Sequence, residues 1–251
     1  MLLFLGFLLS SPTLRASDRY QGVAHTLKGG ALAYRETHWR YQVRGVPTRL
    51  VVYYCPSGAA FARKQVVDSP SAVAPNFMFV DGRDGYEEGV RTKAGGREVY
   101  SREQGDLRRQ PRTIKIGSDA VIDAGFDALV RQRWDELLAG KKVSAAFLLP
   151  SRQDFIPVAI REQSPDRIHG VMRLHMRLDT WFGFAAPDTE LVYRLSDRWL
   201  LSFQGIASVR DDSGRHQAVR IEFPDRLRAN NVGQREINAA KAAPLAASCK
   251  G

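Results

Sequence analysis

The sequence predicts a mainly β, α+β fold: a curved antiparallel sheet, or half-barrel, wrapped around one central amphipathic helix. Three observations lead to this fold class. Many segments alternate between apolar and polar residues, as half-buried strands do. The turns between these segments are too short for the crossovers that parallel strands require. One segment near the middle of the chain instead repeats its apolar residues with helical spacing.

The first strands are predicted to form a meander. Residues 18–33 are rich in glycine and are expected to form a loop before the first strand. Strict alternation then begins at Tyr34, and turns that contain Gly or Pro interrupt it. Strands are predicted at residues 34–43, 49–54, 61–68, 77–80, 86–91, 98–102 and 113–116.

The helical segment follows Asp123 and ends before Gly140. Ser118 or Asp123 is expected to cap its start, and Gly140 is expected to end it in a left-handed conformation. Asp123 and Asp127 suit the positive end of the helix dipole, so we interpret this carboxylate pair as structural. The positions that recur at helical spacing are Phe126, Leu129, Val130, Arg133, Trp134, Leu137 and Leu138.

Strands resume after the helix and complete a single β-rich domain over residues 18–224. Beyond Pro224 the sequence is rich in Ala, Asn and charged residues, without sustained periodicity. Residues 225–251 are therefore expected to form a disordered tail or a weak helix. The later strands are predicted at residues 143–149, 155–162, 168–178, 190–195, 199–203, 205–210 and 216–223.

An apolar block at Leu2–Ser10 indicates export. The block is too short to cross a bilayer as a helix and has the length of the apolar core of a secretory signal. No Lys or Arg precedes it, and Ala16 or Ser17 supplies a small residue for cleavage. We expect residues 1–17 to be a signal peptide or an N-terminal anchor. The protein would then be periplasmic, either released or tethered to the inner membrane.

The formal net charge of +10 favours acidic partners. Basic residues are scattered and commonly lie beside Asp or Glu. The densest basic stretch, residues 102–115, contains no interleaved aromatic residue, which a stacking platform for single-stranded nucleic acid would need. We therefore expect no nucleic-acid partner and favour an anionic membrane surface.

The chain has two cysteines, Cys55 and Cys249. In an exported protein an even number permits one disulfide, which here would tie the tail back to the domain. Cys55 ends an apolar strand, so the alternative is a small, half-buried apolar side chain. We favour this alternative.

No recognisable catalytic or metal-binding pattern is present in the sequence. The five histidines form no zinc motif, and there is no G-x-S-x-G elbow, S-x-x-K pair or P-loop. The acidic segment 81–89 lacks the spacing of an EF-hand, so we interpret it as a hairpin turn rather than a calcium site. Cys55 with a distant His would make a thiol nucleophile, but only the presence of the two residue types supports it. We expect a non-enzymatic protein with no cofactor and no metal.

The segment 193–205, Tyr-Arg-Leu-Ser-Asp-Arg-Trp-Leu-Leu-Ser-Phe-Gln-Gly, is followed by the strand Val219–Phe223. Together they resemble the C-terminal hairpins of uncharacterised periplasmic β-rich proteins of proteobacteria. They are also loosely similar to the half-barrel carriers of outer-membrane lipoproteins. The likeness covers roughly residues 140–224. The carrier resemblance implies an apolar cavity between sheet and helix, and no ligand-binding residue is carried over from it.

The leading hypothesis is an envelope protein that binds a hydrophobic or amphipathic ligand, such as a lipid, a lipidated chain or a lipoprotein. One alternative is an envelope protein–protein scaffold with a filled core, and another is an enzyme whose site is not visible in sequence. A filled space between sheet and helix would favour the scaffold, and an open space would favour the ligand-binding protein. Aromatic residues at a cavity mouth are the candidates for ligand binding, namely Phe126, Trp134, Trp181, Phe182 and Phe184.

Overall fold

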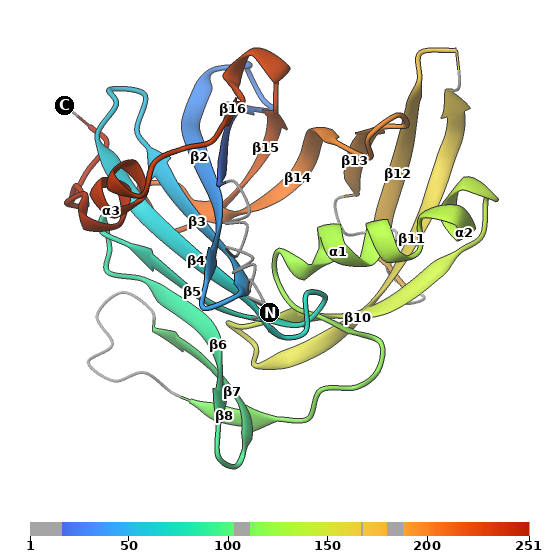
Figure 1. Cartoon of the computed structure of the whole chain (residues 1–251), viewed down its shortest axis with the longest axis horizontal. Helices are drawn as coiled ribbons and strands as arrows, with labels where there is room; N and C mark the ends of the chain where they lie inside the picture. The colour runs from blue at the N-terminus through green and yellow to red at the C-terminus, as the bar shows by residue number, and fades with distance from the viewer. Residues whose placement is uncertain (1–16, 103–110, 167, 180–187, 251) are drawn as a thin grey trace, which may run out of the picture.

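The computed structural model describes residues 17–102, 111–166, 168–179 and 188–250 (Figure 1). These described residues form one large curved sheet of 16 strands that does not close on itself. Its strand pairs are antiparallel except for one short parallel pair near an edge. The predicted fold class, mainly β with a curved antiparallel sheet, is confirmed.

Two meanders make up the sheet. The first contains β1 (Asp18–Thr26), β2 (Leu32–Val43), β3 (Val46–Tyr54), β4 (Ala60–Pro70), β5 (Pro75–Asp81), β6 (Glu87–Lys93), β7 (Gly96–Arg102) and β8 (Arg112–Ile114). The second contains β9 (Ala120–Val121), β10 (Val143–Leu149), β11 (Asp154–Asp166), β12 (Val171–Leu178), β13 (Thr189–Arg194), β14 (Leu200–Arg210) and β15 (His216–Glu222). β8 and β9 lie at the two edges, and β15 pairs with β1 in the centre. The centre of the sheet thus joins the two ends of the domain.

Strand β1 was not predicted, because its glycines suggested a loop. Gly22 lies inside the strand where other chains approach closely. A Cβ at this position would lie 2.7 Å from the Phe223 ring and 2.9 Å from the side chains of Glu36 and Ile221. The glycine therefore serves packing at the β1–β15 junction rather than a turn.

The predicted helix is divided into two short helices, α1 (Gly125–Gln132) and α2 (Trp134–Leu138), which meet at Arg133. Neither expected cap is used, since Ala124 is the N-cap and makes no side-chain cap hydrogen bond. Gly140 adopts the expected left-handed conformation, with φ of 72°. The apolar residues of both helices pack against the second meander. Within the described residues, no helix has the length and apolar character needed to cross a membrane.

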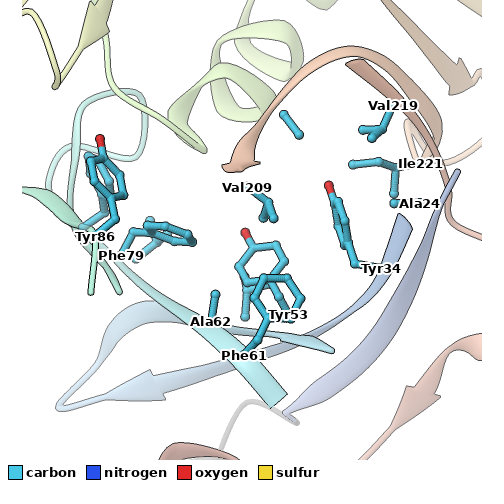
Figure 2. Close-up of a cluster of buried hydrophobic side chains, with 14 of the residues drawn as sticks. Ala24, Tyr34, Tyr53, Phe61, Ala62, Phe79, Tyr86, Val209, Val219 and Ile221 are labelled. Atoms are coloured by element: carbon cyan, nitrogen blue, oxygen red, sulfur yellow. The ribbon is translucent and has the colours of Figure 1, made fainter. Parts of the chain in front are cut away.

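Aromatic side chains fill much of the space enclosed by the first meander. Figure 2 shows Tyr34, Tyr53 and Phe79 pointing from the first meander toward the side of the space where Val209 and Val219 lie. The rings touch one another edge-on, with centroids 5.9 Å apart for the pairs Tyr34–Tyr53 and Tyr53–Phe79. This part of the interior is therefore a packed core.

Residues 225–250 contain a helix, so of the two expectations for the tail, disorder or a weak helix, the structure has the helix. The segment contains a 3-10 turn at Asp225–Leu227, β16 (Ala229–Asn230) and α3 (Gln234–Ala242). Helix α3 packs on β3 from outside the sheet (Figure 1). Its Ile237 and Ala240 are buried in a third core cluster with Trp39, Tyr41, Leu50 and Val52. Burial of this apolar face stabilises a helix that its own sequence predicts only weakly.

The two cysteines form a disulfide, so the favoured interpretation of Cys55 as an unpaired apolar residue was wrong. Cys55 and Cys249 are 194 residues apart, and their Cα atoms are 5.3 Å apart. Cys55 is fully buried, and Cys249 packs against the same cluster from a half-buried position. The bridge ties the end of the chain to the end of β3.

Candidate functional site

A small pocket lies between strands β1–β3 and helix α1. It has a volume of about 110 Å³. Its lining comes from both ends of the domain, because β1 and β15 are neighbours in the sheet. The lining residues are Tyr20 on β1, His38 and Arg40 on β2, Arg49 on β3, Asp127 and Arg131 on α1, and Trp199, Leu200 and Phe223 in or beside β14 and β15.

Strand register brings the polar lining together. Alternate residues of a strand face the same side, so His38 and Arg40 share one face of β2. Tyr20 pairs with His38, and Asp18 pairs with Arg40 across β1 and β2. On the other side of β2, Arg40 pairs directly with Arg49 on β3. The pocket wall is therefore built on a cross-strand row from Asp18 through Arg40 to Arg49.

The three guanidinium groups of the pocket have unequal partners. Arg40 donates two hydrogen bonds from Nε to the Asp18 carboxylate, at 2.8 and 3.1 Å, and a further one from Nη2. Arg131 donates from Nε to Asp127 at 2.9 Å, one helical turn away. The Arg49 guanidinium makes no hydrogen bond or ion pair with any residue that the structure describes. Burial opposes the charge of Arg49, but nearby acidic groups, Tyr20 and Asp127 first, raise its pKa, so it stays charged.

The pairing of Arg40 with Arg49 is electrostatically unfavourable. Like charges directly opposite each other across two strands destabilise a sheet. The Asp18 carboxylate neutralises Arg40 only, and Asp127 is shared between Arg131 and the Tyr193 hydroxyl, which donates to it at 3.1 Å. One positive charge of the pocket is thus left without a contacting carboxylate among the described residues.

His38 contributes an uncharged polar side chain to the pocket lining. Its Nε2 lies 2.8 Å from Glu36 Oε1, and both side chains are buried. Burial lowers the pKa of His38 despite the neighbouring carboxylate, so the ring is neutral at neutral pH. A neutral ring that donates from Nε2 to Glu36 has an unprotonated Nδ1, and this buried atom has no hydrogen-bond partner in the described structure.

Aromatic rings form the rest of the lining. Tyr20 stacks on His38 with centroids 4.4 Å apart and meets Trp199 edge-on at 4.9 Å. The Arg40 guanidinium lies 5.7 Å from the Trp199 ring centroid, and that of Arg228 lies 3.9 Å from it. The pocket therefore offers an anion both guanidinium donors and apolar ring surface.

The predicted ligand-binding aromatics lie elsewhere or outside the described residues. Trp134 is buried, with its ring 5.8 Å from that of Tyr193, and Phe126 packs half-buried against the same cluster. Neither lines the pocket. Trp181, Phe182 and Phe184 lie outside the described residues. A ligand-binding role for these five residues stays a prediction.

The pocket residues were missed because both faces of residues 34–43 carry polar and aromatic side chains. Tyr34, Glu36 and His38 lie on one face, whereas Trp39 and Tyr41 lie on the other. The available signal was the run of polar residues on the first face, at positions 36, 38 and 40. This polar run indicates a site only together with the strand register that pairs Arg40 with Arg49.

A second buried polar cluster lies on the concave side, around Lys64. Its Nζ lies 2.5 Å from Asp123 Oδ1 at the start of α1. Glu88 on β6 accepts a hydrogen bond from the Tyr86 hydroxyl at 2.8 Å. Burial raises the pKa of Glu88 to about 7, against the opposing charge of Lys64. The cluster places several titratable groups in the interior, and none of them lines the pocket.

In the acidic segment 81–89, arginines bind the carboxylates of Asp81 and Asp84 at the turn between β5 and β6. Arg83 donates from Nη2 to Asp81 at 2.7 Å, and Arg210 forms an ion pair with Asp84. Throughout the described residues, no group of three or more His, Cys, Asp or Glu side chains is placed to hold a metal ion.

Comparison with models of known protein families gives no match for this chain, and comparison with curated protein sequences gives none either. The geometry and chemistry of the pocket are therefore the basis for a functional proposal.

Proposed function

We propose that this chain is a non-enzymatic binding protein of the cell envelope that holds an amphipathic anion. The acidic headgroup would bind in the pocket beside Arg40 and Arg49, and the apolar part would extend along the aromatic lining. A lipid or a lipidated chain with an acidic group has this chemistry. The proposal includes export to the periplasm, which the apolar block at Leu2–Ser10 supports.

The observation that carries the proposal is the like-charged pair of Arg40 and Arg49. An anion between the two guanidiniums would replace their repulsion with charge-assisted hydrogen bonds, which are shorter and stronger than neutral ones. Guanidinium suits this role because its planar donors match carboxylate and phosphate oxygens in pairs. The unpartnered Arg49 is the group that such a ligand would satisfy.

The size of the pocket limits what can enter. A volume of about 110 Å³ admits a carboxylate or a phosphate group, whereas a long acyl chain needs far more space. Both charged side chains and aromatic rings line this space. Only the headgroup and the atoms next to it would therefore be enclosed, with Tyr20, Trp199 and Phe223 in contact.

Calorimetric titration of the full chain with matched amphiphiles tests the proposal. Dodecyl phosphate and dodecanoate are the anionic probes, dodecyl maltoside is the uncharged probe, and inorganic phosphate lacks the tail. We expect Arg49→Gln to weaken binding of the anionic amphiphiles by about tenfold, because a charge-assisted hydrogen bond contributes roughly 1.5–3 kcal/mol. Arg235→Gln is the matched control, since Arg235 is exposed on α3 and does not line the pocket.

Three results would overturn the proposal. The first is equal affinity of wild type and Arg49→Gln for the anionic amphiphiles. The second is binding of dodecyl maltoside as tight as that of dodecyl phosphate. The third is inorganic phosphate binding as tightly as dodecyl phosphate, which would remove the amphipathic part of the proposal.

A second candidate function is an envelope protein–protein scaffold, and the packed interior favours it. Tyr34, Tyr53, Phe61 and Phe79 fill the space inside the first meander (Figure 2). A scaffold would bind its protein partners through its outer surface and would bind no ligand in the pocket. Wild-type protein that binds none of the four probes would favour this function over ligand binding.

A further inference from the structure

The C-terminal segment runs over one face of β2 and β3 (Figure 1). The pocket residues His38, Arg40 and Arg49 lie on the opposite face of these two strands. We call residues 225–250 the C-terminal strap. At its start, Val232 N donates to Ser17 O at 3.0 Å, and β16 pairs with the first residues of β1. At its end, Ala246 N donates to Ala60 O at 2.7 Å, and Cys249 is bonded to Cys55. The strap is thus fixed on both sides of β2 and β3.

The strap contacts the residues that alternate with the pocket residues. Leu50 follows Arg49 on β3 and is buried under α3 with Ile237. Trp39 stands between His38 and Arg40 on β2 and faces the strap. Because successive side chains of a strand face opposite sides, a contact on the outer face fixes the backbone from which the neighbouring inner side chain projects.

Glu236 makes the most direct link. Its Oε1 accepts hydrogen bonds from Trp39 Nε1 at 2.8 Å and from Arg19 Nη1 at 2.9 Å. Arg19 and Trp39 are register partners on β1 and β2. The adjacent register pairs on the inner side are Asp18 with Arg40 and Tyr20 with His38. One carboxylate therefore joins the two strands at the level of the pocket.

We propose that the C-terminal strap positions the anion pocket through the sheet, with Glu236 as the positioning residue, and that the Cys55–Cys249 disulfide controls this effect. The inference rests on the proposed function and adds its regulation. Cys249 is the half-buried end of the bridge, so a dithiol reductant attacks there. Two electrons and two protons convert the bridge into two thiols, and the reductant becomes a disulfide. The strap then loses its covalent anchor, and the register around Arg40 loosens.

Titration with dodecyl phosphate tests the role of Glu236 in the oxidised full chain. We expect Glu236→Ala to weaken binding by about three- to tenfold, since the hydrogen-bond acceptor shared by the two strands is lost. Glu236→Gln is expected to stay within about twofold of wild type, because its amide oxygen still accepts from Trp39 and Arg19. Asn238→Ala, an exposed position on the same helix, is the matched control.

The disulfide is tested in the same assay. We expect dithiothreitol to weaken binding by wild type by about threefold or more, and to leave the affinity of Cys55→Ala/Cys249→Ala unchanged. Circular dichroism at the temperature of the assay establishes that each variant is folded. If Glu236→Ala is unfolded, Glu236→Leu replaces it, since leucine keeps apolar contact with the sheet while removing the acceptor. If the double cysteine variant is unfolded, wild type with and without dithiothreitol carries the test of the disulfide.

The outcomes separate the two proposals. Wild type that binds none of the anionic probes overturns the proposed function and this inference with it. Wild type that binds, together with a folded Glu236→Ala of equal affinity, overturns the positioning role alone. Wild type whose affinity is the same with and without dithiothreitol, after reduction is verified by thiol labelling, overturns control by the disulfide.

Discussion

Arg40 and Arg49 face each other at paired positions of β2 and β3, and only Arg40 is held by a carboxylate, that of Asp18. The contact between these two guanidiniums is unfavourable by itself, because like charges at opposed positions of two strands repel. Residues whose local interactions oppose folding are typical of binding sites. In the proposed function, a bound anion would replace the repulsion between the two guanidiniums with charge-assisted hydrogen bonds.

Replacing Arg49 should change the stability of the unbound protein. Arg40 opposes the charge of Arg49 across the two strands, but Tyr20 and Asp127 raise the pKa of Arg49, so the folded state favours the charged side chain. We therefore expect Arg49→Gln to lower the free energy of unfolding by about 0.5 kcal/mol at low ionic strength, with a smaller loss in high salt because salt screens these interactions. Urea denaturation followed by tryptophan fluorescence measures this. The control Arg235→Gln should change stability less. A higher stability of Arg49→Gln would show that repulsion from Arg40 outweighs the attraction of the acidic groups.

Glu88 should make stability depend on pH. Burial raises its pKa in the folded protein to about 7 from an ordinary value of 4.5. The protonated form is thus favoured by folding, and this stabilising contribution is fully present below pH 4.5 and is lost as the pH rises through about 7. Glu88→Gln stays neutral and still accepts from the Tyr86 hydroxyl, so it removes this dependence.

Urea denaturation of wild type and Glu88→Gln across this pH range checks the sign. The stability of the variant relative to wild type should increase from acid to mildly alkaline pH by at most about 3.4 kcal/mol, since the pKa shift is about 2.5 units and each unit corresponds to 1.36 kcal/mol. Glu222→Gln, an exposed change on β15, should follow the wild-type profile. A difference between wild type and Glu88→Gln that is constant with pH would contradict the prediction.

Gly22 should tolerate no side chain. An added Cβ would lie within 3.0 Å of Phe223, Glu36 and Ile221, so Gly22→Ala forces these side chains to move. We expect a loss of about 1–3 kcal/mol in the free energy of unfolding, which is the usual cost of overpacking. Gly95→Ala, where nothing lies within 4 Å of the added atom, should cost less. Equal stabilities of the two variants would contradict the close approach.

The same glycine shows how far the sequence could predict the fold. Alternation identified β2, β3 and β4, because their turns contain Gly or Pro and their apolar residues recur at every second position. β1 was missed, since a glycine in a strand and a glycine in a loop have the same local signature. Only the packing of Phe223 on Gly22, 201 residues apart in the chain (223 − 22), separates the two.

The site depended even more on distant contacts. Arg40 and Arg49 are close in sequence, but Trp199 and Phe223 join them only because β15 pairs with β1. Nothing local indicates that α3 covers Trp39 and Tyr41, so both faces of β2 looked equally suited to the core. The sequence favoured an unpaired Cys55 over the disulfide for the same reason, because a tail without periodicity does not indicate where it packs.

Removing the disulfide should destabilise the domain. We expect Cys55→Ala/Cys249→Ala to lower the free energy of unfolding by about 2–5 kcal/mol, because the bridge closes a loop of 194 residues and restricts the unfolded chain. Urea denaturation without reductant measures the loss. Wild type denatured in dithiothreitol should approach the value of the double variant, whereas Ser248→Ala, beside Cys249, should match oxidised wild type. If the double variant is as stable as oxidised wild type, the packing of α3 alone holds the C-terminal strap in place.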